Sequence, residues 1–61
     1  MAINDYWKIV NDIQTAQTAK EIRKRCNEAE KLIRADNSIS NDDFDELMMT
    51  IAYLYRESAE I

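Results

Sequence analysis

The stretch SNDDFDELMMTIAYLYRES, residues 40–58, decides the fold of this chain because it carries more large apolar side chains than any stretch of equal length before it. Those side chains recur at the spacing that places them on one stripe of a 3.6-residue helix, with Ser58 at its end. The stripe consists of Phe44, Leu47, Met48, Ile51, Leu54 and Tyr55. Met49 and Tyr53 lie off the stripe, about 140° to 180° round the helix from Phe44. We therefore expect a helix with a buried stripe and two apolar side chains on its opposite side.

The segment just before this helix carries the signals of a helix start. Ser40 with Asp43 three residues later resembles a capping box, and Ile39 against Phe44 matches the hydrophobic staple that fixes how the chain enters a helix. Acids are also favoured at the positive end of the helix dipole, and here they are Asp42, Asp43 and Asp45. A calcium loop is the rival interpretation, but an EF-hand needs a glycine at its sharp turn, and the chain has none.

Length and composition limit the fold class. The 61 residues allow one domain, residues 1–61, with a small interior. A chain of this size buries only roughly 60 % of its unfolded surface, so a partner or a second copy would help it to fold. Glycine and proline are absent, and 46 % of the residues are apolar against 33 % charged. That composition excludes a disordered acidic tail and a sheet built on Gly and Pro turns, and it predicts an all-α fold.

A first helix is expected near residues 4–14. Asn4 or Asp5 can cap it, because a short side-chain acceptor there satisfies backbone N–H groups that have no partner in the first turn. Its apolar face consists of Tyr6, Ile9, Val10 and Ile13, continued by Ala16. Trp7 lies at the edge of that face. Its ring either covers the open end of a small core or anchors in a partner's pocket, since Trp is enriched among interface hot spots.

A second helix is expected near residues 19–34. Thr18 with Glu21 matches the capping-box pattern, and the Thr18 cap should contribute about 1 kcal/mol to the helix start. Its apolar stripe, with Leu32 at the edge, consists of Ile22, Cys26, Ala29 and Ile33. Residues 35–40 are rich in Asn, Asp and Ser, which indicates a tight connection to the third helix, near 41–59. Short connections favour antiparallel neighbours, so the sequence predicts a small three-helix bundle.

The second helix also holds six of the eight basic residues. Five of them gather opposite Ile22 in a basic ridge that consists of Lys20, Arg23, Lys24, Lys31 and Arg34. One interpretation is a solvated face whose i,i+4 ion pairs are worth about 0.2 to 0.5 kcal/mol each. The expected pairs are Glu21 with Arg25, Lys24 with Glu28, and Glu30 with Arg34. The alternatives are an acidic protein partner and nucleic-acid phosphate, and the net charge of −4 argues against the second.

The chain lacks the parts of the common catalytic and metal sites. It has no histidine, one cysteine and no glycine loop to hold a phosphate, so we expect no enzyme activity, cofactor or metal. Cys26 falls on an apolar stripe, where a free cysteine behaves as a small buried hydrophobe. No apolar run reaches the roughly 18 to 20 residues of a membrane span, and the start MAINDYWK lacks a secretory signal. These features predict a cytoplasmic protein with no membrane segment.

One pattern extends over about two-thirds of the chain and consists of Thr18 to Ile22, Ala29, Ile39-Ser40, Asp43-Phe44, Leu47 and Arg56. In this pattern, residues 15–56 resemble the helical hairpins of small accessory proteins encoded by phages and other mobile elements of Gram-positive bacteria. The resemblance implies a small protein that acts by binding rather than by catalysis, in the cytoplasm of the host cell. It identifies no target and transfers no functional residue.

The apolar residues outside the core stripes indicate a binding function, because Met and aromatic side chains are enriched in protein interfaces. We expect a protein-binding module, an inhibitor or regulator of a host protein, with Trp7, Met49 and Tyr53 as contacts. One alternative is a DNA-binding transcriptional regulator that presents the basic ridge to phosphates. A helix-turn-helix often has a glycine in its turn, however, and this chain has no glycine. Another is a structural homo-oligomer, such as a dimer in which Met49 and Tyr53 pair across a symmetric interface.

Overall fold

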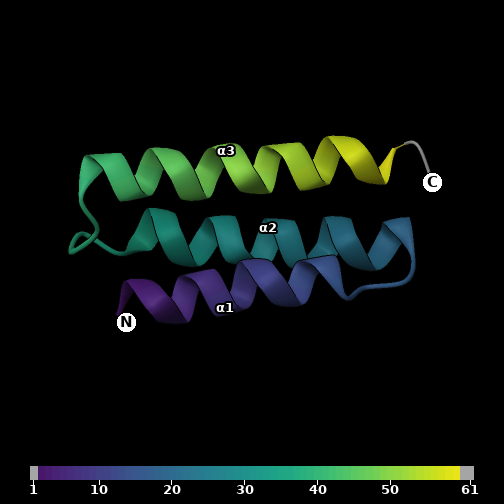
Figure 1. The fold of residues 1–61 in the computed structure, drawn as a ribbon, viewed down its shortest axis with the longest axis horizontal. Helices are drawn as coiled ribbons and strands as arrows, with labels where there is room; N and C mark the ends of the chain where they lie inside the picture. Colours follow the sequence, from purple (N-terminus) through teal and green to yellow (C-terminus); the bar gives the residue numbers. More distant parts are fainter. Residues whose placement is uncertain (1, 60–61) are drawn as a thin grey trace.

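The computed structural model describes residues 2–59, and within them the chain forms three α-helices. α1 comprises Ile3–Gln14, α2 comprises Ala19–Ala35 and α3 comprises Asn41–Ser58. Each helix contacts both others; α2 runs antiparallel to its neighbours, whereas α1 and α3 point the same way (Figure 1). The predicted all-α three-helix bundle is confirmed, and each helix end lies within one residue of the expected position.

Side-chain caps begin α2 and α3. Thr18 Oγ1 accepts a hydrogen bond from the backbone N–H of Glu21, and Ser40 Oγ accepts one from the backbone N–H of Asp43, each at 3.2 Å. Each bond satisfies a backbone donor that has no partner within the first turn. Both predicted caps are therefore confirmed.

The start of α1 differs from the prediction. The helix begins at Ile3, so Asn4 and Asp5 lie inside it rather than at its N-cap. The carboxylate of Asp5 accepts a hydrogen bond from the backbone N–H of Ala2 at 3.2 Å. An acid is also favourable beside the positive end of the helix dipole. Asp5 therefore supports the helix start from within the first turn. The expectation that Asn4 or Asp5 is the N-cap residue is wrong.

The core consists of the predicted apolar faces of all three helices. Its buried members are Tyr6, Val10 and Ile13 from α1, Ile22, Cys26, Ala29 and Ile33 from α2, and Leu47 and Ile51 from α3. Further apolar side chains are half-buried against them, among them Ile9, Ala16, Ile39, Phe44, Met48 and Leu54. Leu32, expected at the edge of its stripe, is 46 % exposed. The periodicity therefore identified the core faces correctly: the whole stripe of α2 is buried, whereas the faces of α1 and α3 also have half-buried members.

Tyr55 is the exception on the predicted stripe of α3. Its side chain is 43 % exposed, and the guanidinium carbon of Arg23 lies 6.0 Å from its ring centre. A tyrosine at the margin of a core keeps its hydroxyl in water and offers its ring face to a cation. The expectation that Tyr55 belongs to the core is therefore wrong. Ser58, by contrast, is buried: its hydroxyl donates to the carbonyl of Tyr55 at 2.5 Å and accepts from Arg23 Nε–H at 3.2 Å.

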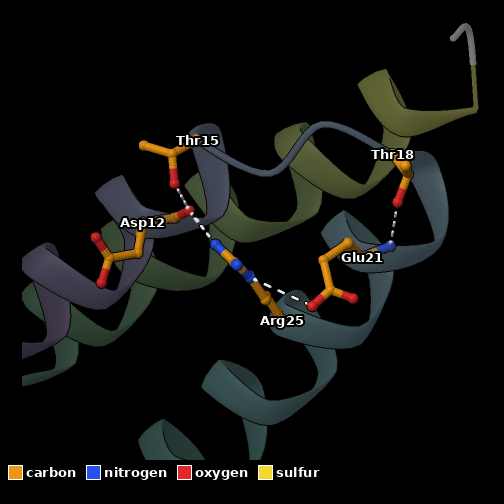
Figure 2. A network of polar contacts seen from close by, with 5 residues as sticks. All are labelled: Asp12, Thr15, Thr18, Glu21 and Arg25. Atoms are coloured by element: carbon orange, nitrogen blue, oxygen red, sulfur yellow. Dashed lines mark hydrogen bonds and ion pairs between the residues drawn. The ribbon is translucent and has the colours of Figure 1, made fainter.

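A polar network joins α1 to α2 at one end of the bundle, and Figure 2 shows Arg25 at its centre. One Arg25 Nη1–H donates to the backbone carbonyl of Asp12 at 2.8 Å, and Thr15 Oγ1–H donates to the same carbonyl at 2.7 Å. Arg25 Nε also lies 3.9 Å from a carboxylate oxygen of Glu21. The carbonyl of Asp12, in the last turn of α1, also accepts from the backbone N–H of Thr15 at 3.1 Å. Arg25 therefore adds a bond from α2 to a carbonyl that the C-terminal cap of α1 already engages.

A second polar cluster closes the opposite end, where α2 leads into α3. The hydroxyl of Tyr6 donates to the Asp36 carboxylate, which also accepts from the backbone N–H and hydroxyl of Ser38 at 2.8 and 2.5 Å. The bonds from Ser38 and from Tyr6 hold the pKa of Asp36 well below its usual range. The same carboxylate raises the pKa of Tyr6 to about 12, because it accepts a hydrogen bond from the neutral phenol and its negative charge disfavours the phenolate. The cluster thereby ties α1 to the α2–α3 connection.

Candidate functional site

Met49 and Tyr53 are the most exposed large apolar side chains among the described residues, at 72 % and 58 %. They lie one turn apart on α3, on the side away from Leu47 and Ile51. The neighbouring positions on this side are also exposed. We define the outer face of α3 as Asp42, Asp45, Met49, Ala52, Tyr53 and Arg56. The face has apolar residues at its middle and acids toward the N-terminal end of the helix, with the exposed Glu46 beside them. Toward the C-terminal end, Arg56 lies next to the exposed Glu57.

A shallow groove of about 570 Å³ runs between α2 and α3, next to this face. Met48, Ile51, Ala52 and Tyr55 supply its apolar lining, and Asn27, Glu30, Arg34 and Arg56 supply its polar lining. Ala52 and Arg56 belong both to the groove and to the outer face, so the two form one continuous surface. Apolar residues exposed together in this way are typical of a binding surface.

Trp7 does not belong to that surface. Its side chain is half-buried and packs against the core from α1, whereas Met49 and Tyr53 point outward from α3. The structure therefore separates Trp7 from the other two predicted contacts. Of its two interpretations, the covering role is the one that its packing matches, while any contact with a partner through the exposed part of the ring is still a prediction.

The five residues of the basic ridge are all exposed on α2, but two of them already have intramolecular contacts. Arg23 bonds to Ser58 and lies over the ring of Tyr55. Arg34 Nε donates to a Glu30 carboxylate oxygen at 2.9 Å. The remaining members, Lys20, Lys24 and Lys31, lie on the solvated side. Two predicted i,i+4 pairs, Glu30–Arg34 and Glu21–Arg25, are present, and Lys24 makes no ion pair with Glu28 in the described residues.

Cys26 has the environment of a structural cysteine. It is 1 % exposed, and its thiol approaches the carbonyl of Ile51 at 3.8 Å. Burial raises the pKa of the Cys26 thiol, and the nearby negative charge of Glu30 raises it further. The thiolate, which is the reactive form, is therefore disfavoured. The predicted burial of Cys26 is confirmed.

Other chemistry has little support in the described residues. Residues 2–59 contain no group of three or more Cys, Asp or Glu side chains placed to hold a metal ion. None of the three helices in that part of the chain combines the length and apolar composition needed to cross a bilayer. A second groove, between α1 and α2, is lined by Ile9, Leu32 and Arg25 among others. It contains no residue that the sequence singled out for binding.

Sequence reasoning identified Met49 and Tyr53 but missed the groove beside them. Tyr55 was assigned to the core, and Ala52 and Arg56 received no role. No local sequence signal could have revealed the groove, because its lining comes from α2 and α3 together.

Comparisons of the chain with protein family models, curated proteins and solved structures found no match. The resemblance to accessory proteins of phages and mobile elements has no support from these comparisons and stays a prediction. The outer face of α3 and the adjoining α2–α3 groove are therefore the basis of the functional proposal.

Proposed function

We propose that this protein is a small protein-binding module that acts through the outer face of α3 and the adjoining α2–α3 groove. The observation that carries the proposal is the exposure of Met49 and Tyr53, at 72 % and 58 %, beside an apolar groove. Leaving two such side chains in water gives no stability to the monomer, whereas covering each apolar Å² contributes about 25 cal/mol. A partner that covers them supplies that contribution.

The finer proposal is that the module inhibits or regulates a protein of a host cell, in the host cytoplasm, as a product of a phage or mobile element. Its support is the resemblance of residues 15–56 to accessory proteins of such elements and the absence of a catalytic constellation in the sequence. Activity by binding alone suits a chain with no histidine and one buried cysteine.

The test replaces Met49 and Tyr53 together by alanine and measures partner capture from a lysate of the native host. Both side chains lie outside the core, so the helical circular dichroism signal should be unchanged while capture falls at least tenfold. The matched control is Leu32→Ala, which removes an exposed apolar side chain that lines the other groove. Capture that is unchanged by the double substitution, or lost equally with Leu32→Ala, would contradict the proposed surface.

Trp7 is tested separately because truncating it would also disturb the core. It is the only tryptophan, so its fluorescence reports directly on its surroundings. A partner that covers the exposed part of the ring should shift the emission to shorter wavelength, whereas an unchanged spectrum on binding removes Trp7 from the contact surface.

The competing function, DNA binding through the basic ridge, has a specific observation against it. Arg23 and Arg34 are held by contacts within the chain, which leaves three lysines on a protein of net charge −4. Non-specific DNA binding depends on neutralising several phosphates. A gel shift at low salt that vanishes with Arg23→Glu and Lys24→Glu would favour this alternative.

A further inference from the structure

The exposed surface of α3 has two sides that differ in charge. Ala52 and Arg56 lie toward α2, because both line the α2–α3 groove. Met49 and Tyr53 do not line that groove. At about 100° per residue, they lie about 60° and 100° further round the helix than Ala52, away from the groove. The two most exposed apolar side chains of α3 therefore face away from α2.

Three acids lie on the same side of α3 as these two apolar residues. We define the acidic flank of α3 as Asp42, Glu46, Met49, Tyr53 and Glu57. All five are exposed, and they lie within an arc of about 80° round the helix. Arg56, the one basic residue in Asn41–Ser58, borders the flank on its groove side. The flank therefore presents apolar surface with carboxylates before and after it along the helix.

The stability of α3 does not account for two of these acids. Asp42 lies in the first turn, where an acid is favourable at the positive end of the helix dipole. Glu46 lies beyond that turn and four residues from Asp42, a spacing at which like charges destabilise a helix. Glu57 lies in the last turn, where the negative end of the dipole disfavours an acid. The charges of Glu46 and Glu57 therefore weaken the helix rather than support it.

The chain does not compensate these two charges. Neither Glu46 nor Glu57 has an ion pair in the part of the chain that the structure describes. No basic residue stands three or four positions from either of them, which is the spacing of a helical ion pair. Six of the eight basic residues belong to α2, and Lys8 belongs to α1. The negative charge of the flank is therefore available to a partner.

We infer that the acidic flank binds a basic, amphipathic segment of another protein, in which Lys or Arg side chains stand beside apolar ones. The inference rests on the proposed function, because it names the chemistry of the partner that covers Met49 and Tyr53. The apolar side chains of the segment cover this pair, and its cations meet the carboxylates at both ends. The ring of Tyr53 also offers its face to a cation. Charge complementarity of this kind speeds encounter and excludes partners of the wrong sign.

Other occupants match the flank less well. Nucleic acid and anionic membrane surfaces carry charge of the same sign as the flank and are repelled by it. A second copy of the chain could offer the basic ridge of α2. That ridge consists of lysines and arginines, however, and has no apolar side chain to cover Met49 and Tyr53. A segment that combines cations with apolar side chains matches both properties of the flank.

The first experiment measures the fluorescence anisotropy of a labelled synthetic peptide of leucine and lysine that forms an amphipathic helix. The chain should bind it, and binding should weaken as salt is added, because exposed ion pairs are screened. A peptide with serine in place of leucine should bind roughly tenfold more weakly, because it leaves Met49 and Tyr53 in water. A peptide with glutamate in place of lysine should not bind. Equal binding of the leucine and serine peptides, or binding of the glutamate peptide, would overturn the inference.

The second experiment locates the peptide with two variants that change the net charge equally. Glu46→Gln with Glu57→Gln removes two acids of the flank. The matched control, Asp12→Asn with Glu28→Gln, removes two exposed acids that line the other groove. The flank variant should bind the leucine–lysine peptide about fivefold more weakly at low salt, with unchanged circular dichroism, and the control should bind it as the unsubstituted chain does. Equal losses in both variants would show a general charge effect and overturn the inference.

The outcomes separate this inference from the proposed function, which is tested with Met49→Ala and Tyr53→Ala together. If that double substitution abolishes capture of a host protein while Glu46→Gln with Glu57→Gln leaves capture intact, the proposed function stands and the inference fails. If the alanine substitutions change neither capture nor peptide binding, both fail. Self-association of the chain that Lys24→Glu abolishes would place a second copy on the flank and overturn the inference. Displacement of the captured host protein by the leucine–lysine peptide supports it.

Discussion

The inner and outer faces of α3 carry apolar side chains of similar size in opposite surroundings. Leu47 and Ile51 are 0 % and 3 % exposed, whereas Met49, two residues from each, is 72 % exposed. A step of two residues turns a helix by about 200°, which is enough to move a side chain from the core to solvent. The comparison teaches that apolar content alone does not identify a core residue. Position round the helix decides whether an apolar side chain is buried. The apolar side chains on the outer face are therefore available for a partner.

The largest expected contrast between the faces comes from truncation to alanine. Leu47→Ala should lower the free energy of unfolding by about 2 to 5 kcal/mol, because it removes a fully buried side chain and leaves a cavity. Met49→Ala should change it by no more than about 0.5 kcal/mol, because the side chain is in water in both states. Urea unfolding followed by circular dichroism at a concentration that keeps the chain monomeric measures both. Equal losses would mean that Met49 is covered within the monomer.

The alkylation rate of the Cys26 thiol is an independent test of the difference between the inner and outer faces of α3. Its buried thiol, close to the Ile51 carbonyl, should react slowly with an alkylating reagent until the contact between α2 and the inner face opens. Leu47→Ala should therefore accelerate alkylation, and Met49→Ala should leave its rate unchanged. Fast alkylation of the unsubstituted chain would show that the inner face opens more readily than its burial indicates.

The next prediction concerns pH, because two titratable groups of the Tyr6–Asp36–Ser38 cluster tie α1 to the connection between α2 and α3. The folded-state pKa of Asp36 is lowered, so its contribution to stability is present above its unfolded pKa of about 3.9 and is lost as the pH falls below it. The pKa of Tyr6 is raised to about 12 from 10.0. Its contribution is therefore present below pH 10.0 and is lost as the pH rises toward the folded value. Thermal melts across this range should show stability falling at both ends.

Tyr6→Phe is the variant that isolates the cluster, since it keeps the ring in the core and removes only the hydroxyl. It should lower the melting temperature near neutral pH, make the acid-side loss shallower and abolish the alkaline loss that Tyr6 causes. Asp36→Asn should flatten the acid side more strongly, because the Ser38 bonds to a charged acceptor are removed as well. An acid profile that both variants leave unchanged would show that Asp36 does not govern it.

The sequence could predict the inner face because burial there depends on local periodicity. Ile22, Cys26, Ala29 and Ile33 recur at helical steps, and each is buried as expected. Thr18 and Ser40 act as caps because their signals lie within three residues of the groups that they bond. In both cases the relevant interaction is short in sequence or repeated along a helix.

Other features could not be predicted because they depend on how helices sit against each other. The bonds of Tyr6 to Asp36 and of Arg25 to the Asp12 carbonyl join residues 30 and 13 positions apart. Tyr55 has the right spacing for the core, yet it lies at the margin of the α2–α3 contact, under Arg23. The groove beside Met49 likewise exists only once two helices are in place. Sequence periodicity shows which side of each helix faces the core, but it does not give the distances between helices.

The end of the inner face offers a smaller contrast, between two hydroxyls that bond to backbone carbonyls of α3. Ser58→Ala should cost about 0.5 to 1.5 kcal/mol, since it removes a buried hydroxyl that also accepts from Arg23. Thr50→Ala, which loses only a bond to the carbonyl of Glu46, should be neutral or slightly stabilising because alanine has the higher helix propensity. Chemical unfolding of both variants gives the comparison. A larger loss of unfolding free energy for Thr50→Ala than for Ser58→Ala would contradict the expectation that the buried hydroxyl contributes more.

The smallest expected effect lies at the groove, where Glu30 and Arg34 form an ion pair at 2.9 Å with side chains that are 38 % and 63 % exposed. Glu30→Gln should cost no more than about 0.2 to 0.5 kcal/mol, because water screens both charges and the pair is an ordinary i,i+4 contact. The loss should disappear in high salt, since screening already weakens the pair in the unsubstituted chain. A loss that persists in salt would mean that Glu30 stabilises the α2–α3 contact by packing. The groove would then be part of the folding core, and only the outer face of α3 would remain for a partner.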